Sequence, residues 1–323
     1  MTNTDSTSPA HSSSTPGTTD TTDASLTPRI SCPVCDAVSV EAIDGWVVAR
    51  GQKAMACRAC GVLFTYPPPP PESLHRYYSD AGEWQAARAA KRAKAQTKTK
   101  RGAPALLALL DRHFPATQPR TGARVFDFGC GFGIWLNSFQ DRGWITSGLE
   151  PSTDVAFIRH ERLTSIPSDA RFDLVIVWHV LEHLPRPLDT LRALAAALVP
   201  GGYCLVSVPR VDTLAVHGDL SYILQSRAHV VAYTEACLRG LLASCSLETV
   251  TALHELDDVF SEGAPLRLRL LARKGRPSAA GPSPSAALTP VLEAVATLLR
   301  ARMAESSRRT DDSQPSPPAR PSG

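Results

Sequence analysis

Four cysteines stand in two closely spaced pairs near the start of the chain. Cys32 and Cys35 are separated by two residues, as are Cys57 and Cys60, and 21 residues lie between the two pairs. This spacing lets each pair turn two thiolates toward one tetrahedral ion, so it predicts a zinc site. An ion with four protein ligands has no open position, which makes the site structural rather than catalytic. A redox pair and ordinary core thiols are the alternatives.

A glycine-rich stretch further along could hold a nucleotide-like ligand. Gly129, Gly131 and Gly133 follow an expected strand and open an expected helix. Glycines in such a turn let backbone N–H groups approach a ligand closely. Asp127 lies at the end of the strand, and Glu150 ends the next strand, where an acid can bind ribose hydroxyls. These residues alone leave a dinucleotide, S-adenosylmethionine or a plain strand–helix turn as possibilities.

A second polar loop follows the apolar run 172–178. It carries His179, Glu182 and His183 in the order His-x-x-Glu-His. Zinc peptidases place a similar pattern on a helix. Here the first histidine directly follows a buried strand, and two prolines close the segment. We therefore interpret it as a loop at the carboxyl end of a strand, where open parallel sheets bind their ligands.

The order of these segments resembles that of the class I S-adenosylmethionine-dependent methyltransferases. The matching pieces are DFGCGFG, GLEP, FDLVIVWHVLEHLPRP and LVPGGYCLVSVP, which together cover roughly residues 120–210. The resemblance implies an α/β fold with a Rossmann-like, doubly wound and mostly parallel sheet, and S-adenosylmethionine as cofactor. The cofactor-binding residues that it implies are Asp127, Gly129, Gly131, Gly133, Glu150 and His179.

The resemblance continues on both sides of this region. Members with a CPxC…CxxCG ribbon, a proline-rich spacer and a Tyr-Tyr helix are familiar among bacterial methyltransferases of small or poorly defined substrates. The corresponding segments here are the cysteine pairs, the five prolines at 67–71 and Leu74–Tyr78. Arg227–Thr234 is similar to the segment of that subgroup in which a histidine and then Phe/Tyr-Thr precede the next helix.

One segment is shorter than in the family. Only 21 residues, 151–171, separate Glu150 from the strand at 172–178, where the family usually has a helix and a strand. We expect Val155–Ile158 to supply the third strand directly. Glu161 is then a candidate contact for the adenine ring.

Alternating strand-like and helical segments predict the sheet that must position these residues. Such alternation favours a parallel, doubly wound sheet. Strands are expected at 124–128, 144–149, 172–178, 203–208, 247–253 and 266–272, with helices at 132–142, 187–198 and 234–244. The last strand alternates apolar and polar residues after a Gly-Ala-Pro turn, and we expect it to be an antiparallel edge strand.

Two histidines are candidate catalytic residues. In enzymes of the resembling class, a nucleophile attacks the methyl group of the cofactor in line, so orientation supplies much of the acceleration. A base is needed where the acceptor is a hydroxyl or a carbon acid. His183 follows the strand at 172–178, and His229 lies in the loop before a later helix. Imidazole titrates near neutral pH, so either could accept the proton. The alternative is that each only packs or forms a hydrogen bond.

Composition limits the possible classes of protein. Lys+Arg 34 against Asp+Glu 31 gives a net charge of +3, which does not suggest a dedicated nucleic-acid binder. No apolar run approaches the ~18 residues of a membrane span. The N-terminus lacks the pattern of a secretory signal, and the eight cysteines do not require disulfides in a chain with this large a core. We therefore expect a cytoplasmic protein.

Changes in composition along the chain predict its domains. The ranges are a disordered N-terminus at 1–28, a zinc ribbon at 29–66, a proline spacer with a basic helical linker at 67–118, a methyltransferase domain at 119–275, and a mostly disordered tail at 276–323. One amphipathic helix is expected at about 290–305 within the tail, starting from Thr289 as N-cap. It could dock on its own domain or bind a partner.

The main functional hypothesis is a methyltransferase for a small molecule, such as a sugar or a natural-product intermediate. An RNA-modifying enzyme is the alternative, with the ribbon and the basic run from Arg88 to Arg101 holding RNA. No aromatic residue lies among those seven basic residues, which disfavours nucleic acid. A catalytically dead, ribbon-type binding protein is a third hypothesis, favoured by the short segment 151–171 and disfavoured by the intact glycine loop. The acceptor atom and the oligomeric state cannot be deduced from the sequence.

Overall fold

The structure is a computed structural model. It describes residues 30–49, 51–70, 72–73, 76, 103–113, 122–151, 159–169, 171–214, 220–224, 228–254, 267–275 and 288–311. The described residues from Ser31 onward belong to one compact unit. The expected disordered N-terminus, the Tyr-Tyr pair, the basic run 88–101 and the expected strand Val155–Ile158 lie outside the described residues. The domain limits stay a prediction.

A seven-stranded sheet forms the centre of this unit, with the order β10-β11-β8-β7-β4-β5-β6. Its strands are β4 (Arg124–Phe128), β5 (Ile145–Leu149), β6 (Glu161–Arg162), β7 (Phe172–Trp178), β8 (Leu198–Pro209), β10 (Leu247–Ala252) and β11 (Arg267–Lys274). Neighbours from β6 through β8 pair in parallel, while β11 pairs with β8 and β10 in antiparallel fashion. The predicted α/β class with a mostly parallel sheet is confirmed.

One detail of the sheet differs from the sequence-based expectation. The strand β11 is antiparallel as expected, but it does not lie at the edge, because β10 pairs with its outer side. The position of β11 inside the sheet agrees with its burial. Leu268, Leu270 and Leu271 of this strand are almost fully buried, as is typical of a strand in the interior of a sheet. At the other edge, the outermost strand is Glu161–Arg162, which pairs with Ser147 and Gly148.

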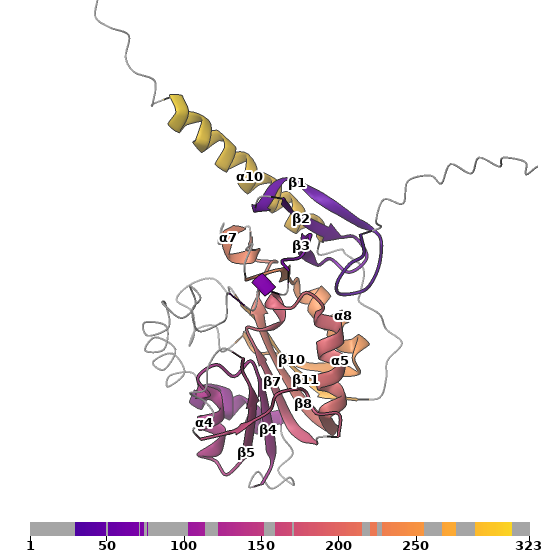
Figure 1. Cartoon of the computed structure of the whole chain (residues 1–323), viewed down its shortest axis with the longest axis vertical. Helices are drawn as coiled ribbons and strands as arrows, with labels where there is room; N and C mark the ends of the chain where they lie inside the picture. Colours follow the sequence, from indigo (N-terminus) through magenta and orange to yellow (C-terminus); the bar gives the residue numbers. More distant parts are fainter. Residues whose placement is uncertain are drawn as a thin grey trace, which may run out of the picture. The chain divides into compact units, whose positions relative to one another are not determined.

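Helices cover both faces of the sheet (Figure 1). The helix α4 (Ile134–Gln140) lies on one side, and α5 (Pro187–Ala197) and α8 (Glu235–Ser244) lie on the other. α5 begins at Pro187, whose fixed φ suits a first helical residue. The Thr234 hydroxyl caps α8 by accepting a hydrogen bond from the Cys237 N–H.

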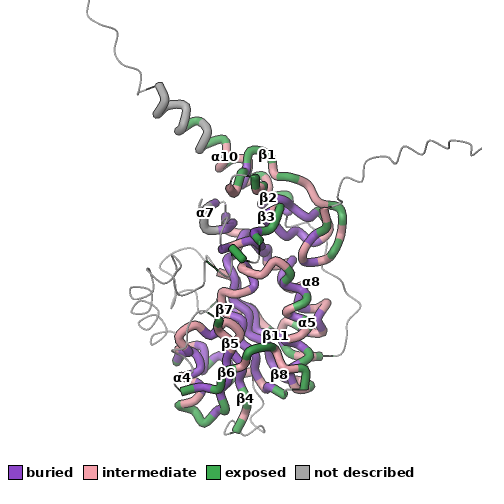
Figure 2. Tube along the Cα trace, in the orientation of Figure 1, coloured by how far each residue is buried: buried purple, intermediate pink, exposed green. Residues whose placement is uncertain are grey.

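The core follows the central strands (Figure 2). β7 reads as an apolar run, FDLVIVW, because both of its faces are covered. Residues 103–113 are helical and add apolar side chains, Leu106 and Leu110 among them, to the face that α4 also covers. The cysteines outside the quartet are all buried, as expected for core residues: Cys130, Cys204, Cys237 and Cys245.

A second sheet lies next to the cysteine pairs in the chain and has the order β1-β2-β3-β9. Three antiparallel strands come from the N-terminal part: β1 (Val40–Ala49), β2 (Gln52–Cys57) and β3 (Leu63–Tyr66). The fourth, β9 (Val231–Ala232), comes from the loop that follows His229. The N-terminal ribbon and the loop of a candidate catalytic residue therefore share one sheet.

The expected amphipathic helix packs on its own chain. α10 spans Leu288–Asp311, so Thr289 lies inside the helix rather than at its N-cap. Leu288, Val291 and Val295 are buried in a cluster with Trp46 of the ribbon. Of the two hypotheses for this helix, the structure supports docking on its own domain.

Candidate active site

The glycine loop leaves β4 with its backbone turned toward open space. Gly129, Gly131 and Gly133 all have positive φ, at 81°, 53° and 67°. A Cβ on Gly129 would lie 2.4 Å from Val180 Cγ2, so this glycine allows close packing against the β7 loop. A Cβ on Gly131 would meet nothing within 4 Å. Gly131 therefore borders free space next to a backbone that could approach a ligand.

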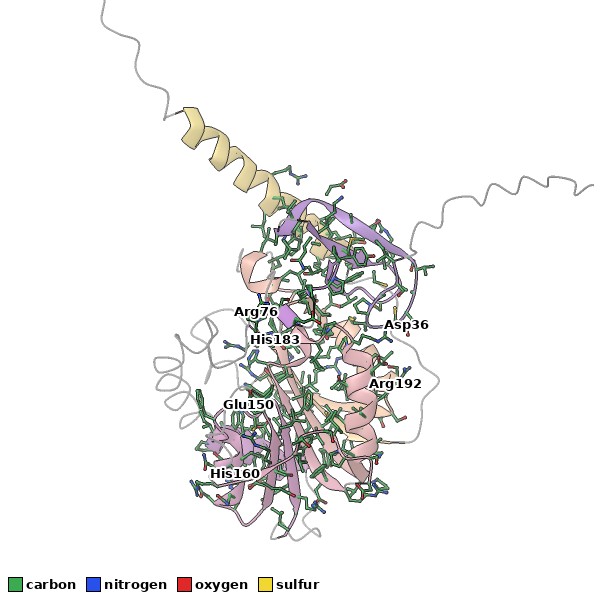
Figure 3. The ribbon with its side chains drawn as sticks, in the orientation of Figure 1. Asp36, Arg76, Glu150, His160, His183 and Arg192 are labelled. Carbon is green, nitrogen blue, oxygen red and sulfur yellow. The ribbon has the colours of Figure 1, made fainter. Side chains whose placement is uncertain are left out.

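Glu150 closes the other side of this space. It follows β5, and its Oε2 accepts a hydrogen bond of 3.0 Å from the Gly131 N–H. The Gly129 N–H donates to the Leu149 carbonyl at 2.7 Å, which joins the two strand ends again. Glu150 is partly buried and visible in Figure 3 beside the central strands. The structure thus brings Gly131 and Glu150 together, as the sequence predicts.

Asp127 lies under the loop and is only 1% exposed. Burial raises the pKa of its carboxyl group to about 8, with a smaller contribution from the negative charge of Glu150. Its Oδ1 has no hydrogen-bond partner among the described residues. Asp127 is therefore a buried acid with an open bonding position at the carboxyl end of β4.

The β7 loop begins with a strained histidine. His179 has φ 57°, a region that residues other than glycine rarely adopt. Its N–H donates to the Ser207 carbonyl at 2.8 Å, which fixes the turn against β8. Its Nδ1 lies 3.0 Å from Oε1 of Glu182. His179 also directly precedes Val180, the residue that packs on Gly129.

Glu182 is the buried centre of this loop. It lies in the short helix η2 (Leu181–His183) and is 0% exposed. Burial raises the pKa of its carboxyl group, while the neighbouring His183 and His229 oppose that shift. Glu182 is part of the His-x-x-Glu-His pattern in the sequence, but the sequence analysis gave it no functional role. The available signal was a lone acid in the loop after a buried strand.

His183 is held in one tautomer. Its Nδ1 lies 2.9 Å from the Ala228 carbonyl oxygen, which can only accept, so Nδ1 carries the hydrogen. In the neutral ring, Nε2 then keeps its lone pair, and it lies 3.9 Å from Oε1 of Glu182. Burial lowers the pKa of His183 despite the nearby carboxyl group. The site therefore holds a neutral imidazole whose basic nitrogen is defined.

The two candidate catalytic histidines come together. The ring centroids of His183 and His229 are 5.0 Å apart. The loops that carry them are joined by main-chain bonds, because the Val230 N–H donates to the Glu182 carbonyl at 2.7 Å. The Tyr233 hydroxyl adds a bond to the Leu181 carbonyl at 3.1 Å. In Figure 3, His183 is labelled near the part of the chain that forms the ribbon.

A buried arginine is a further feature that sequence reasoning missed. Arg269 of β11 is 2% exposed, and its guanidinium carbon lies 5.7 Å from the centre of the Trp178 ring. Trp178 is the last residue of β7, next to His179. The signal was the LRLRLLA alternation, which places Arg267 and Arg269 on one face of the strand. Glu161, the candidate adenine contact, is exposed on β6.

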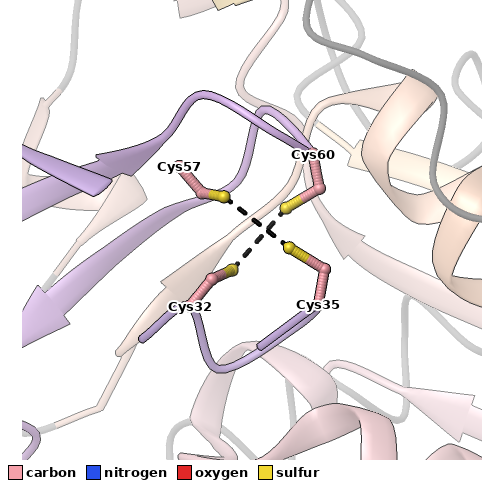
Figure 4. A group of neighbouring side chains, drawn as sticks. All are labelled: Cys32, Cys35, Cys57 and Cys60. Atoms are coloured by element: carbon pink, nitrogen blue, oxygen red, sulfur yellow. Dashed lines mark hydrogen bonds between the residues drawn. The ribbon is translucent and has the colours of Figure 1, made fainter. Parts of the chain in front are cut away.

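The four paired cysteines form one compact cluster (Figure 4). The Cys32 and Cys60 sulfurs are 3.6 Å apart, the Cys35 and Cys57 sulfurs 3.7 Å, and all four lie within 4.8 Å of one another. A tetrahedral zinc ion with Zn–S bonds of ~2.3 Å requires sulfurs ~3.8 Å apart. The donor set and its dimensions therefore fit a zinc ion.

Glu182, His183 and His229 also place three potential ligand atoms within 4.8 Å of one another. Hydrogen bonds already occupy Oε1 of Glu182 and Nδ1 of His183. Oε2 of Glu182 is buried and has no hydrogen-bond partner among the described residues. No described helix has the length and apolar character needed to cross a membrane.

Residues 98–252 match the methyltransferase domain family. The parallel sheet and the glycine loop define the same class. The match confirms, over these residues, the methyltransferase resemblance found in the sequence.

Relatives of known activity cover only part of the chain. The ubiquinone biosynthesis O-methyltransferase of Vibrio vulnificus is 30% identical over 102 residues, 27% of this chain and 43% of that protein. A tRNA U34 carboxymethyltransferase of Pseudoalteromonas translucida is 30% identical over 130 residues, 35% of this chain and 39% of that protein. The chain thus spans less than half the length of either relative.

Two solved methyltransferase structures are similar to part of the chain. The 1,6-didemethyltoxoflavin-N1-methyltransferase of Burkholderia thailandensis has a TM-score of 0.47 and 17% identity, covering 71% of this chain and 98% of that chain. A putative methyltransferase complex with the Trm112 activator of Haloferax volcanii has a TM-score of 0.46 and 18% identity, covering 60% of this chain and 98% of that chain.

Proposed function

We propose that the protein transfers the methyl group of S-adenosylmethionine to a small molecule. The observation that carries the proposal is the space bordered by Gly131 and Glu150, at the carboxyl end of a parallel sheet. The bound cofactor would supply an electrophilic methyl group. The glycine loop would lie against its methionine portion at Gly131, where no side chain fills the space, and Glu150 would accept hydrogen bonds from the ribose hydroxyls.

Asp127 and His179 complete the proposed cofactor site. Asp127 has a buried oxygen with an open bonding position, which could accept a hydrogen bond from the cofactor's amino group. His179 belongs to the loop that packs on Gly129, so it would border the same space. Both residues would orient the cofactor rather than take part in bond changes.

His183 is the proposed general base, and His229 is its neighbour on the acceptor side. The basic Nε2 of His183 could take the proton of an acceptor hydroxyl or acidic carbon as the methyl group moves to that atom. The nearby Glu182 would stabilise the resulting imidazolium ion. The main-chain bond to Ala228 keeps the ring in the required tautomer.

We also propose that the cysteine quartet binds one structural zinc ion. Cys57→Ser should release the ion and unfold the ribbon, because metal binding and folding are coupled in such small units. Elemental analysis of protein purified without added metal should give one zinc per chain for the wild type. Cys245→Ser is the matched control, since this buried cysteine lies outside the cluster. A zinc-free wild type with a folded ribbon would contradict the assignment.

Internal packing supports a small acceptor over RNA. The outer edge of β3 is paired with β9, and α10 contacts β1, so two surfaces of the ribbon are already used within the chain. Arg58, a basic residue of the ribbon, forms an exposed ion pair with Glu41. A ribbon built to bind nucleic acid would instead present its cations to the phosphates.

Calorimetric titration with S-adenosylmethionine tests the proposed function. Saturable binding with one site per chain is the expected result. Transfer of a labelled methyl group to small-molecule extracts, but not to total RNA, would support the acceptor class. Labelling of RNA would favour the alternative enzyme, and absence of cofactor binding would leave only the binding-protein hypothesis.

A further inference from the structure

The zinc ribbon and the candidate catalytic histidines are connected by a continuous set of main-chain hydrogen bonds. β3 of the ribbon pairs with β9, with Leu63 opposite Ala232 and Phe64 opposite Val231. One more bond runs from the Thr65 N–H to the Val230 carbonyl at 2.9 Å. The strand on the ribbon side, β3, therefore directly precedes the proline spacer, and β9 on the other side begins two residues after His229.

The connection continues from β9 to His183. Val230 accepts from the ribbon through its carbonyl and donates through its N–H to the Glu182 carbonyl at 2.7 Å. Two residues earlier, the Ala228 carbonyl accepts from Nδ1 of His183. The position of Ala228–Val230 thus decides the tautomer of His183, and β3 holds this segment in place.

The residues that form the pairing between β3 and β9, called the seam below, are buried from water. Leu63, Phe64 and Thr65 are at most 3% exposed, and Val230, Val231 and Ala232 are at most 2% exposed. Hydrogen bonds in such surroundings do not exchange freely with water, so losing one is costly. Just after β9, the Tyr233 carbonyl accepts a hydrogen bond of 3.1 Å from the N–H of Val211, which lies two residues beyond the end of β8 in the central sheet.

The cysteine pairs flank the strands that make this seam. Cys57 ends β2, and Cys60 lies three residues before β3 begins. The Cys57 N–H also donates to the Val62 carbonyl at 3.0 Å. An ion that holds Cys57 and Cys60 with the first pair would therefore fix the start of β3.

We propose that the zinc ribbon is a positioning element of the methyl-acceptor half of the active site, acting through the Thr65–Val230 bond on His229 and on the tautomer of His183. This inference rests on the proposed function, because only a methyltransferase has a methyl-acceptor half in its active site. The coupling itself can be measured without any substrate. The cofactor half, around Gly131 and Glu150, has no such bond to the ribbon among the described residues.

Thr65→Pro is the most specific test. Proline removes the N–H that is donated to Val230. The N–H of Thr65 points to β9 rather than to β2, so the hydrogen bonds between β2 and β3 are retained. Thr65→Val is the matched control, because valine keeps both the N–H and the side-chain shape.

The readout is the ¹H–¹⁵N signal of the His183 Nδ1–H in protein with ¹⁵N-labelled histidine, assigned with His183→Gln. In the wild type and in Thr65→Val, we expect a slowly exchanging Nδ1–H. In Thr65→Pro, this signal should be lost or should exchange at least ~10-fold faster, while zinc content stays at one per chain. Affinity for S-adenosylmethionine should stay within about twofold of the wild type.

Removing the metal from the full chain with a chelator provides a second route, which does not depend on how Thr65→Pro folds. It should cause the same loss of the Nδ1–H signal with the same retention of cofactor binding. An unchanged His183 signal in zinc-free protein would overturn the proposal. Loss of cofactor binding together with the signal would also overturn it, because the ribbon would then support the whole domain. If wild-type protein binds no cofactor, the proposed function fails, and the His183 signal still decides the coupling.

Discussion

At the scale of single residues, the site combines glycines that border open space with buried acids and histidines of defined protonation. Gly131 and Glu150 form the part that sequence motifs identify. Glu182 and Asp127 are acids placed where water is excluded, and their raised pKa values follow from that burial. Each of these features leads to a measurable consequence of one substitution.

Gly131→Val should abolish cofactor binding while the fold is retained. The valine side chain would enter the space that nothing else occupies within 4 Å, where the cofactor is proposed to lie. We expect affinity to fall by at least ~100-fold, which corresponds to about 2.7 kcal/mol. Gly122→Val is the matched control, since Gly122 also has positive φ, 88°, and open space around it. Equal effects of the two substitutions on affinity would mean that backbone strain, not the cofactor site, is responsible.

Asp127→Asn should change how stability depends on pH. The folded pKa of about 8 lies above the ~3.9 of an unfolded chain, so the folded state keeps a proton that the unfolded state has lost. Wild-type stability should therefore fall between about pH 4 and pH 8, by up to ~1.4 kcal/mol per pH unit from this group. Asparagine does not titrate, so the variant lacks this fall in stability. Relative to the wild type, it should therefore be more stable at pH 8 than at pH 4.

Thermal unfolding of cofactor-free protein across this pH range measures the effect. Asp141→Asn serves as the control, because the Asp141 side chain is 72% exposed. Parallel pH curves for wild type and Asp127→Asn would show that Asp127 is ionised in the fold.

His183→Ala should reduce turnover by ~10²–10⁴-fold with little change in cofactor affinity, the usual scale for loss of a general base. A base must be neutral before it accepts a proton, and burial lowers the pKa of His183 below its usual ~6.5. Wild-type activity should therefore decline only at acidic pH, below that value. His254→Ala, at an exposed position, is the control. Near-normal turnover of His183→Ala would mean that the acceptor needs no deprotonation.

At the scale of elements, the carboxyl ends of β4, β5 and β7 bring together residues from three segments of the chain. The 3₁₀ turn of η2 and the loop before β9 then add His183 and His229. Strand β9 has only two residues, yet it joins the ribbon sheet to the loop of the candidate base. Small elements therefore decide the geometry of the acceptor side, whereas the large parallel strands decide that of the cofactor side.

At the scale of the whole molecule, α10 ties the end of the chain to the ribbon. Val295 is 0% exposed in the cluster with Trp46 and Leu288. Val295→Ala should lower the free energy of unfolding by ~1–3 kcal/mol, the scale for removing buried methyl groups. Glu293→Ala, two residues away at an exposed position, should change it by less than ~0.5 kcal/mol. Urea unfolding compares the two variants, and equal small effects would show that α10 is not docked in solution.

Features that depend on neighbours along the chain could be predicted from the sequence. The paired cysteines, the glycine loop between β4 and α4, and the acid at the end of β5 are local patterns, because a turn or a metal knuckle needs only a few adjacent residues. For the same reason, the apolar run of β7 and the alternation of β11 predicted strands at the correct places. The class of the domain followed from the order of these local patterns.

Contacts between segments far apart in the sequence could not be predicted in this way, and they became known from the folded chain. That β10, not β11, is the edge strand depends on pairing between segments far apart in sequence, which local periodicity does not encode. The role of Glu182 depends on its burial between His179 and His183, and the tautomer of His183 depends on a carbonyl 45 residues away. Burial and hydrogen-bond partners set pKa values and tautomers, so the chemistry of these residues is a property of the folded chain rather than of its motifs.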